Sequence, residues 1–160
     1  MSYSLDTREG NFESKHKSLR ISDSNLSQTV NASTFNFVSG SEISYLPVEG
    51  SDYVVYETSF YMAALSYECF VHVKLTESSD GGQSFSNVAN SDASWGSRDT
   101  SMIPEQLCSY KILLDSWANT EKIFRLEAQG VGSLSCYLHR VVNGSLHYNP
   151  VTTCYSITEV

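Results

Sequence analysis

The sequence has little positive charge and no long apolar run. Its 160 residues include 10 Lys and Arg against 18 Asp and Glu, a formal net charge of −8 at pH 7. Nonspecific nucleic-acid binding needs clustered cations that release counterions from phosphates, so we expect no nucleic-acid partner. No segment approaches the roughly 20 apolar residues of a membrane-spanning helix, and we expect no membrane insertion. The opening residues, MSYSLDTREGNF, show no basic lead before an apolar run, which predicts no secretory signal.

Signatures of catalysis and of metal binding are also missing. No CxxC pair and no HxH pair occurs, which disfavours a zinc site. There is no GxSxG nucleophile elbow, and no pair of acids is marked out for general acid–base work. We therefore predict a protein that is not an enzyme, without cofactor, catalytic residues or metal ligands.

The four cysteines, Cys69, Cys108, Cys136 and Cys154, are far apart in the chain. Each falls within a predicted strand, where a thiol usually serves as a small buried hydrophobic group. We expect four free, buried thiols, with disulfide pairing as the alternative.

Strand-forming residues are plentiful, and they are densest from residue 53 to residue 75. In the second half of this stretch, Cys69, Val71, Val73 and Leu75 fall on one face of an alternating strand. The first half, residues 53–65, is apolar on both faces, which predicts a central strand between two covered surfaces.

Further alternating segments recur at even spacing through the chain, separated by turns rich in Gly, Asn and Asp. Asp80-Gly81-Gly82 predicts a hairpin tip over residues 77–88, with Phe85 and Val88 returning to the core. No stretch of ten residues has a helical stripe. We predict an all-β fold with little helix, namely an antiparallel β-sandwich of jelly-roll topology with about eight strands. An up-and-down barrel is the alternative.

The two ends of the chain differ in composition. Residues 1–31 are polar with sparse apolar positions, and we interpret them as an N-terminal arm or an edge segment. Residues 32–160 form the predicted jelly-roll domain. Within it, residues 90–100 are predicted to be a polar loop around Trp95.

Several short motifs occur from about residue 35 to the end of the chain. They are Gly40-Ser41-x-Ile43-x-Tyr45-x-Pro47, Ser51-x-x-Val54-Val55-Tyr56-Glu57, His72-Val73-Lys74, Asp80-Gly81-Gly82, Phe124-x-Leu126, Tyr137-Leu138-His139 and Pro150 with Ile157-Thr158. In order and spacing these motifs resemble those of C-terminal domains in structural proteins of marine bacteriophages and algal viruses.

This resemblance implies a trimeric jelly roll of the tumour necrosis factor and complement-head type, at a fibre tip or on a virion surface. The implied function is host attachment or adhesion by a homotrimer that meets a host-surface glycan or receptor and other virion proteins. The implied location is the virion, after synthesis in the host cytoplasm. Two alternatives stay open: a monomeric carbohydrate-binding module, and a capsid decoration protein that binds only virion partners.

Trp95, Arg98 and Asp99 are the predicted ligand-binding residues. A loop tryptophan beside a cation and a carboxylate could stack on a sugar and hydrogen-bond its hydroxyls. The alternative is that Trp95 folds back and caps the sandwich.

Tyr56, Phe60, Tyr137 and His139 are the predicted trimer-interface residues. Aromatic side chains on strands are enriched both in cores and at oligomer interfaces, so a core position is the alternative.

His72 and Glu57 stand out as polar residues on strongly apolar strands. His72 and His139 could form a metal pair, but a histidine satisfied by a carboxylate such as Glu57 is the more ordinary arrangement. A carboxylate at position 57 should either pair with a cation, Lys74 or Arg125, or face a subunit axis.

Overall fold

The computed structural model describes residues 16–20, 27–32, 34–64, 68–98, 105–131, 136–139 and 150–158. Within these residues the chain forms strands and no helix. Accordingly, the described part contains no helix long and apolar enough to cross a membrane. The strands are β1 (His16–Arg20), β2 (Gln28–Val30), β3 (Asn36–Phe37), β4 (Ile43–Tyr45), β5 (Tyr53–Ala64), β6 (Glu68–Ser78), β7 (Ser86–Asn87), β8 (Ala93–Arg98), β9 (Glu105–Asp115), β10 (Lys122–Gly130), β11 (Cys136–Leu138) and β12 (Val151–Ile157).

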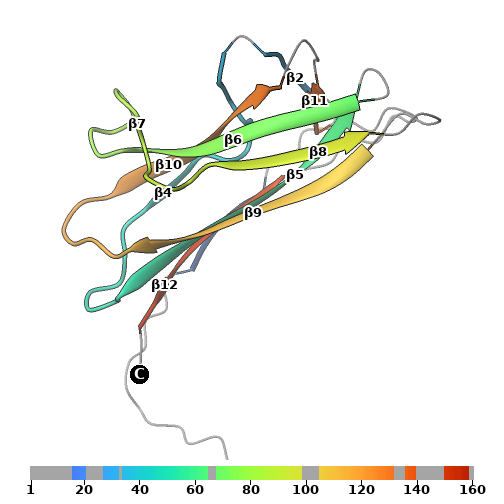
Figure 1. Ribbon diagram of the computed structural model, residues 1–160. Helices are drawn as coiled ribbons and strands as arrows, with labels where there is room; N and C mark the ends of the chain where they lie inside the picture. The colour runs from blue at the N-terminus through green and yellow to red at the C-terminus, as the bar shows by residue number, and fades with distance from the viewer. Residues whose placement is uncertain are drawn as a thin grey trace, which may run out of the picture.

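Two antiparallel sheets pack face to face, with β6, β8 and β10 in one layer and β5, β9 and β12 in the other (Figure 1). The prediction of an antiparallel β-sandwich is confirmed. The described residues contain twelve strands and not about eight, because segments of two or three residues pair as separate strands. The jelly-roll connectivity stays a prediction.

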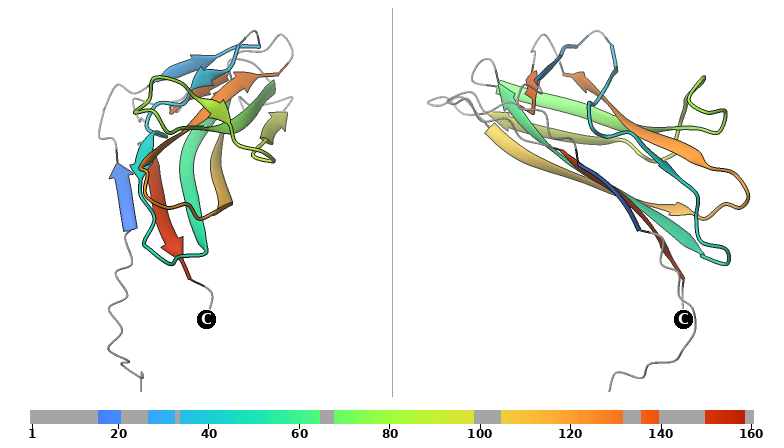
Figure 2. Two further views of the ribbon diagram at one scale, coloured as in Figure 1. Left: turned by 90° about the vertical axis from the view of Figure 1, so that its left-hand side faces the viewer. Right: turned by 180° about the vertical axis from the view of Figure 1, so that it is seen from behind.

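The first sheet, called sheet A here, is built around β5. One edge of β5 pairs with β9 over its whole length, and the other pairs with β12 and then with β11. Seen from behind, β12 runs beside β5, and β1 follows on the other side of β12 (Figure 2). The predicted central position of this strand is confirmed.

The second sheet, called sheet B here, is built around β6 and β10, which pair over eight residues. Short strands β3 and β4 continue the sheet beyond β10, and β7 and β8 continue it beyond β6. Of its residues, Cys69, Val71, Val73 and Leu75 are fully buried, as the alternation on β6 predicts.

The core fills the space between the sheets. Sheet A contributes every second residue of β5, from Val54 through Tyr56 and Phe60 to Met62, and sheet B contributes Phe124 and its neighbours on β10. Large aromatic side chains bury the most apolar area per residue, so each of them contributes strongly to the hydrophobic stabilisation of this sandwich.

The hairpin predicted over residues 77–88 is confirmed, because β6 and β7 pair on either side of Gly81 and Gly82, which both have positive φ. Val88 packs against the core as expected. Phe85 does not return to the core: its ring lies 3.6 Å from the guanidinium carbon of Arg125. A cation–π contact on the outer face of sheet B holds this ring instead.

All four cysteines are buried, as predicted. The expectation that all four are free thiols is wrong, because Cys69 and Cys136 form a disulfide while Cys108 and Cys154 remain free. The bond connects β6 of sheet B to β11 of sheet A. The two cysteines are 67 residues apart in the sequence, and only the packing of the two sheets brings them together, so the sequence could not predict this pairing.

Part of the N-terminal segment pairs with the sandwich. Strand β1 lies at an edge of sheet A against β12, and β2 pairs with β11 in the same sheet. The division of the chain at residue 31 stays a prediction.

Candidate functional site

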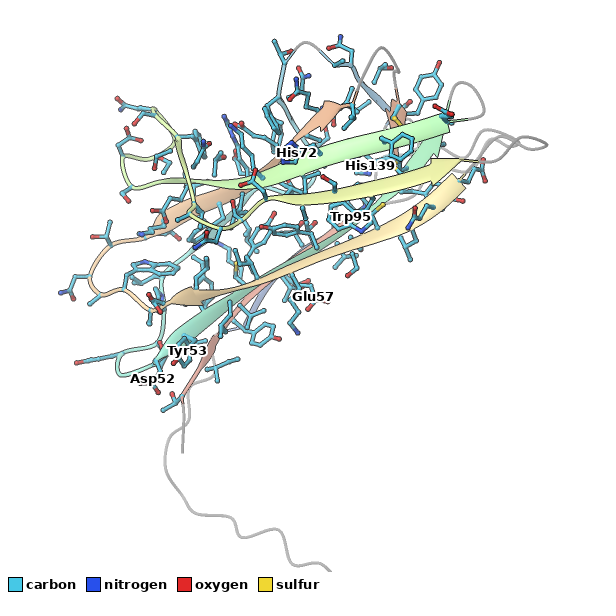
Figure 3. All side chains as sticks on the ribbon, viewed as in Figure 1. Asp52, Tyr53, Glu57, His72, Trp95 and His139 are labelled. Atoms are coloured by element: carbon cyan, nitrogen blue, oxygen red, sulfur yellow. A yellow bond between two sulfur atoms is a disulfide. The ribbon has the colours of Figure 1, made fainter. Side chains whose placement is uncertain are left out.

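Trp95 lies in a strand. The predicted polar loop over residues 90–100 is wrong, because Ala93–Arg98 forms β8 and pairs with β6. Side chains alternate along a strand, so Trp95 points inward, between β8 and β9 (Figure 3). Its ring meets those of Phe60, at 5.5 Å between centroids, and Tyr110, at 6.3 Å. This position is the capping alternative of the sequence analysis.

The three predicted ligand-binding residues are not brought together as a site by the described structure. Trp95 and Arg98 belong to β8. Asp99 lies outside the described residues. Trp95 borders a cavity of about 190 Å³ beside Tyr110 and Ile112, and it is partly buried against the core.

Tyr56 and Phe60 are core residues with no exposed surface. The Tyr56 hydroxyl donates a 2.6 Å hydrogen bond to the carbonyl oxygen of Ser41, and burial raises the pKa of Tyr56 well above its ordinary value. A side chain without exposed area adds no contact area to an interface. The assignment of these two residues to an interface is therefore corrected: they are core residues.

His139 is also fully buried, at the end of β11 with a φ of 63°. Burial lowers the pKa of His139 to about 4, and the backbone of Ser39 opposes that shift only in part. Neither ring nitrogen has a hydrogen-bond partner of normal geometry among the described residues. His139 is therefore a neutral core histidine, and its assignment to an interface is corrected in the same way.

Tyr137 remains on the surface side of sheet A. It is half-buried and lies opposite Ala63, whose side of β5 faces away from sheet B. Of the four predicted interface residues, it is the one whose side chain lies on an outer face.

The outer face of sheet A carries a broad set of apolar and aromatic side chains. Leu107 and Leu113 on β9 are 54% and 55% exposed, the highest values among the large apolar residues described. No described element packs on this face. By strand register the set comprises Tyr53, Tyr61, Leu107, Leu113, Tyr137, Val151, Tyr155 and Ile157, whereas Val55 on the same side of β5 is buried.

An ion pair lies at the centre of this face. Lys111 Nζ is 3.6 Å from Glu57 Oε2 and donates a 3.2 Å hydrogen bond to the Tyr155 hydroxyl. The hydrogen bond to Tyr155, together with the Glu57 carboxylate, raises the pKa of Lys111. Glu57 points away from sheet B (Figure 3). The predicted pairing of Glu57 with a cation is confirmed in kind, but the partner is Lys111 from the neighbouring strand.

Lys74 and Arg125 are used on the opposite side of the molecule. Both pair with Glu127, at 3.6 Å and 2.9 Å, on the outer face of sheet B. His72 lies on the same face and its Nε2 is 3.0 Å from Asp92 Oδ1. This contact satisfies His72 with a carboxylate, as expected in kind, and the carboxylate is that of Asp92 and not of Glu57.

Within the described ranges no group of three or more His, Cys, Asp or Glu side chains could hold a metal ion. His72 is half-buried on β6, whereas His139 is fully buried at the end of β11. The two histidines are therefore in different environments on different sheets, and the idea of a shared metal pair is corrected.

Comparisons with known proteins add little to this description. No family model matches the chain, and no curated protein matches it. Among solved structures, the Eiger TNF from S. frugiperda has a TM-score of 0.39 at 8% identity, with 84% of this chain and 94% of that chain covered. The structure of infectious bursal disease virus Gt strain has a TM-score of 0.39 at 7% identity, with 100% of this chain and 41% of that chain covered. Similarity this low assigns no family and no function.

Proposed function

We propose that this chain is a non-enzymatic surface domain of a virion, at a fibre tip or on the capsid surface, that assembles as a homotrimer and mediates host attachment. The resemblance of its motifs to viral structural domains supports the virion context. The apolar outer face of sheet A is the observation that carries the assembly. We assign a second copy of the same chain to that face.

The composition of the face favours a partner of its own kind. Large apolar side chains that are more than half exposed and gather on one face of a domain mark interaction sites. Leu107 and Leu113 lie near opposite ends of β9, with half-buried tyrosines beside them on β5 and β12. Aromatic side chains of this type are enriched at protein interfaces.

Charge supports the same partner. Each copy carries a net charge of −8, so two copies repel unless they meet through a region with little net charge. Lys111 and Glu57 neutralise each other at the centre of the face. The other described carboxylates on it, those of Glu105 and Asp115, lie at the two ends of β9. The centre of the outer face is thus the region where like-charged copies can approach.

Attachment would then work through avidity. Three copies on one axis, repeated over many fibres or capsid positions, turn weak single-site binding into stable adhesion. This multiplication requires no high-affinity pocket in one copy.

The test is the absolute mass in solution, measured by light scattering after size exclusion at several protein concentrations. A trimer gives three times the 17.8 kDa of the chain. A monomer at all concentrations overturns the proposed assembly and favours a single-site binding module. A monomer that joins a capsid protein added in the same experiment favours a decoration protein.

A further inference from the structure

A second tryptophan, Trp117, borders a pocket at one end of the sandwich. The pocket lies between the connection from β4 to β5 and the connection from β9 to β10, at the end marked by Asp52 (Figure 3). Its volume is about 580 Å³, within the range of small-molecule sites in proteins. Leu46, Pro47 and Trp117 supply apolar walls, and Glu49, Ser116 and Asn119 supply polar groups.

Trp117 lines this pocket with a partly exposed indole whose N–H group is already bonded within the chain. Its Nε1 already donates a 2.9 Å hydrogen bond to the carbonyl oxygen of Thr120. The ring packs against Phe124 at 5.3 Å and lies under Lys122 Nζ at 5.0 Å from its centroid. Lys122 is itself tied to Glu77 at 2.9 Å. A fixed, partly exposed indole of this kind can stack on a flat apolar surface of a ligand.

The hydrogen bonds of the two pocket serines show which hydroxyl donates and which accepts. Ser51 Oγ donates its single hydrogen to the carbonyl oxygen of Val48 at 2.8 Å. Its 2.9 Å contact with Ser116 Oγ must therefore use the Ser116 hydrogen. The Ser116 oxygen keeps its lone pairs, so it is an acceptor for a ligand hydroxyl at the pocket wall.

Two exposed side chains add complementary groups. Asn119 sits at a left-handed φ of 65°, and its amide supplies both donors and an acceptor. Glu49 supplies an acceptor only and places negative charge at the rim. In a chain of net charge −8, this rim repels anionic ligands such as sialic acids, sulfated sugars and phosphates.

Backbone hydrogen bonds tie the walls of the pocket together before any ligand arrives. The amide of Ser116 donates to the carbonyl oxygen of Asp52 at 2.9 Å, which joins the two connections. Ser51 closes a turn on Val48 through its amide at 3.1 Å, and Gly50 supplies the positive φ of that turn. Pre-formed walls reduce the ordering cost of binding.

We propose that this pocket binds one neutral pyranose unit of a surface glycan, stacked on Trp117 with its hydroxyls on Ser116, Asn119 and Glu49. A pyranose has the required two-sided chemistry, with an apolar face of C–H groups and a polar rim of hydroxyls. The inference gives a ligand class to the attachment function proposed above, but binding at this pocket does not require the trimer.

The test uses ¹⁵N-labelled full-length chain titrated with methyl glycosides of glucose, galactose, mannose and N-acetylglucosamine, with the methyl glycoside of N-acetylneuraminic acid as the anionic probe. The chain has two tryptophans, so its spectrum shows two indole N–H signals, which the Trp95→Phe variant assigns. We expect at least one neutral glycoside to shift the Trp117 signal, and we expect the sialoside to leave it unmoved.

Two variants probe the contacts separately. Trp117→Ala should weaken binding by about tenfold, the loss expected for one stacking contact. Because Trp117 also packs on Phe124, Asn119→Gly is the second variant: it removes the amide and keeps the left-handed backbone. Asn119→Gly should weaken binding while the Trp117 signal of the free protein stays in place. Trp95→Phe lies on β8, away from the connections that line the pocket, and this variant should bind as well as the unsubstituted chain.

The outcomes separate this inference from the proposed assembly when mass is measured on the same samples. A trimer in which no neutral glycoside moves the Trp117 signal overturns the pocket and leaves the assembly in place. A monomer that binds a neutral glycoside at Trp117 overturns the assembly and retains the pocket. Binding that moves only the Trp95 signal, or that survives both Trp117→Ala and Asn119→Gly, also overturns the pocket.

Discussion

Cys69 of β6 and Cys136 of β11 form a disulfide that joins the two sheets. It closes a long segment of chain, with a sequence separation of 67 residues. In the chain-entropy account of cross-linking, closing a loop of this length lowers the entropy of the unfolded chain and so raises the free energy of unfolding by about 4 kcal/mol. The bond is therefore a large fraction of the stability expected for a domain of this size.

The first prediction concerns thiol counts. Burial raises the pKa of both Cys108 and Cys154 to about 12, so neither forms a thiolate at neutral pH in the folded protein. Intact mass after alkylation should show no label on the native chain, two labels after denaturation, and four after denaturation with reductant. Four labels without reductant would contradict the disulfide.

The second prediction concerns the strength of that bond. Replacing both Cys69 and Cys136 by Ala should lower the free energy of unfolding by about 4 kcal/mol, measured by urea denaturation. Reductant should destabilise the unsubstituted chain by a similar amount and leave the double variant unchanged. Equal sensitivity of the two proteins to reductant would argue that the cysteine pair adds nothing to stability.

The third prediction concerns acid stability through His139. The folded-state pKa is lowered to about 4, against an ordinary value of about 6.5, so protons bind the unfolded chain more readily in between. Neutral His139 therefore contributes to the free energy of unfolding. This contribution is fully present above pH 6.5 and is lost as the pH falls toward 4, by about 3 kcal/mol in total.

The measurement is the free energy of unfolding against pH for the unsubstituted chain and for His139→Asn. Asparagine tolerates the positive φ at this position and does not titrate. The difference between the two curves should change between pH 6.5 and pH 4 and be flat above pH 7. A constant difference over the whole range would show that His139 does not titrate with folding.

The fourth prediction separates core from interface at Tyr56. Tyr56→Phe removes the hydrogen bond to the Ser41 carbonyl and should cost about 1–2 kcal/mol of stability, because that buried oxygen loses a partner. The mass by light scattering should be unchanged. A change in mass without a change in the midpoint of unfolding would instead place Tyr56 at a subunit contact.

The fifth prediction concerns the outer face of sheet A. Leu113→Asp places a carboxylate on an apolar face, where association would have to desolvate it, so the mass should fall toward 17.8 kDa. Val131→Asp is the matched control, since Val131 is 45% exposed and lies just after β10 of sheet B. The control should keep the mass of the unsubstituted chain, and equal losses in both variants would argue against this face.

Much of the fold could be predicted because alternation carries its own physical signal. The dry face of β6 was visible in Cys69, Val71, Val73 and Leu75, since successive side chains of a strand point to opposite sides. The hairpin at Gly81 and Gly82 was visible because positive φ suits glycine. The prediction for Phe85 was wrong because a phenylalanine can pack its ring against an arginine as well as in a core.

The candidate sites were harder to predict, because alternation separates two faces without saying which one is inside. Leu107, Lys111 and Leu113 share one face of β9, but only the pairing of β9 with β5 turns that face outward. The same pairing turns Tyr56 and Phe60 inward. Trp95 looked exposed because its neighbours in the chain are polar, yet a strand places those neighbours on the other side.

The sequence by itself determined the all-β class, the central place of β5, the hairpin after β6 and the burial of all four cysteines, because each depends on local alternation or on turn chemistry. The tertiary structure alone decided that Cys69 meets Cys136, that Lys111 is the partner of Glu57 and that Trp117 stands beside Ser116 in a pocket. These contacts join residues on different strands or connections. Their distances follow from sheet pairing and sheet packing, which the pattern along one strand does not encode.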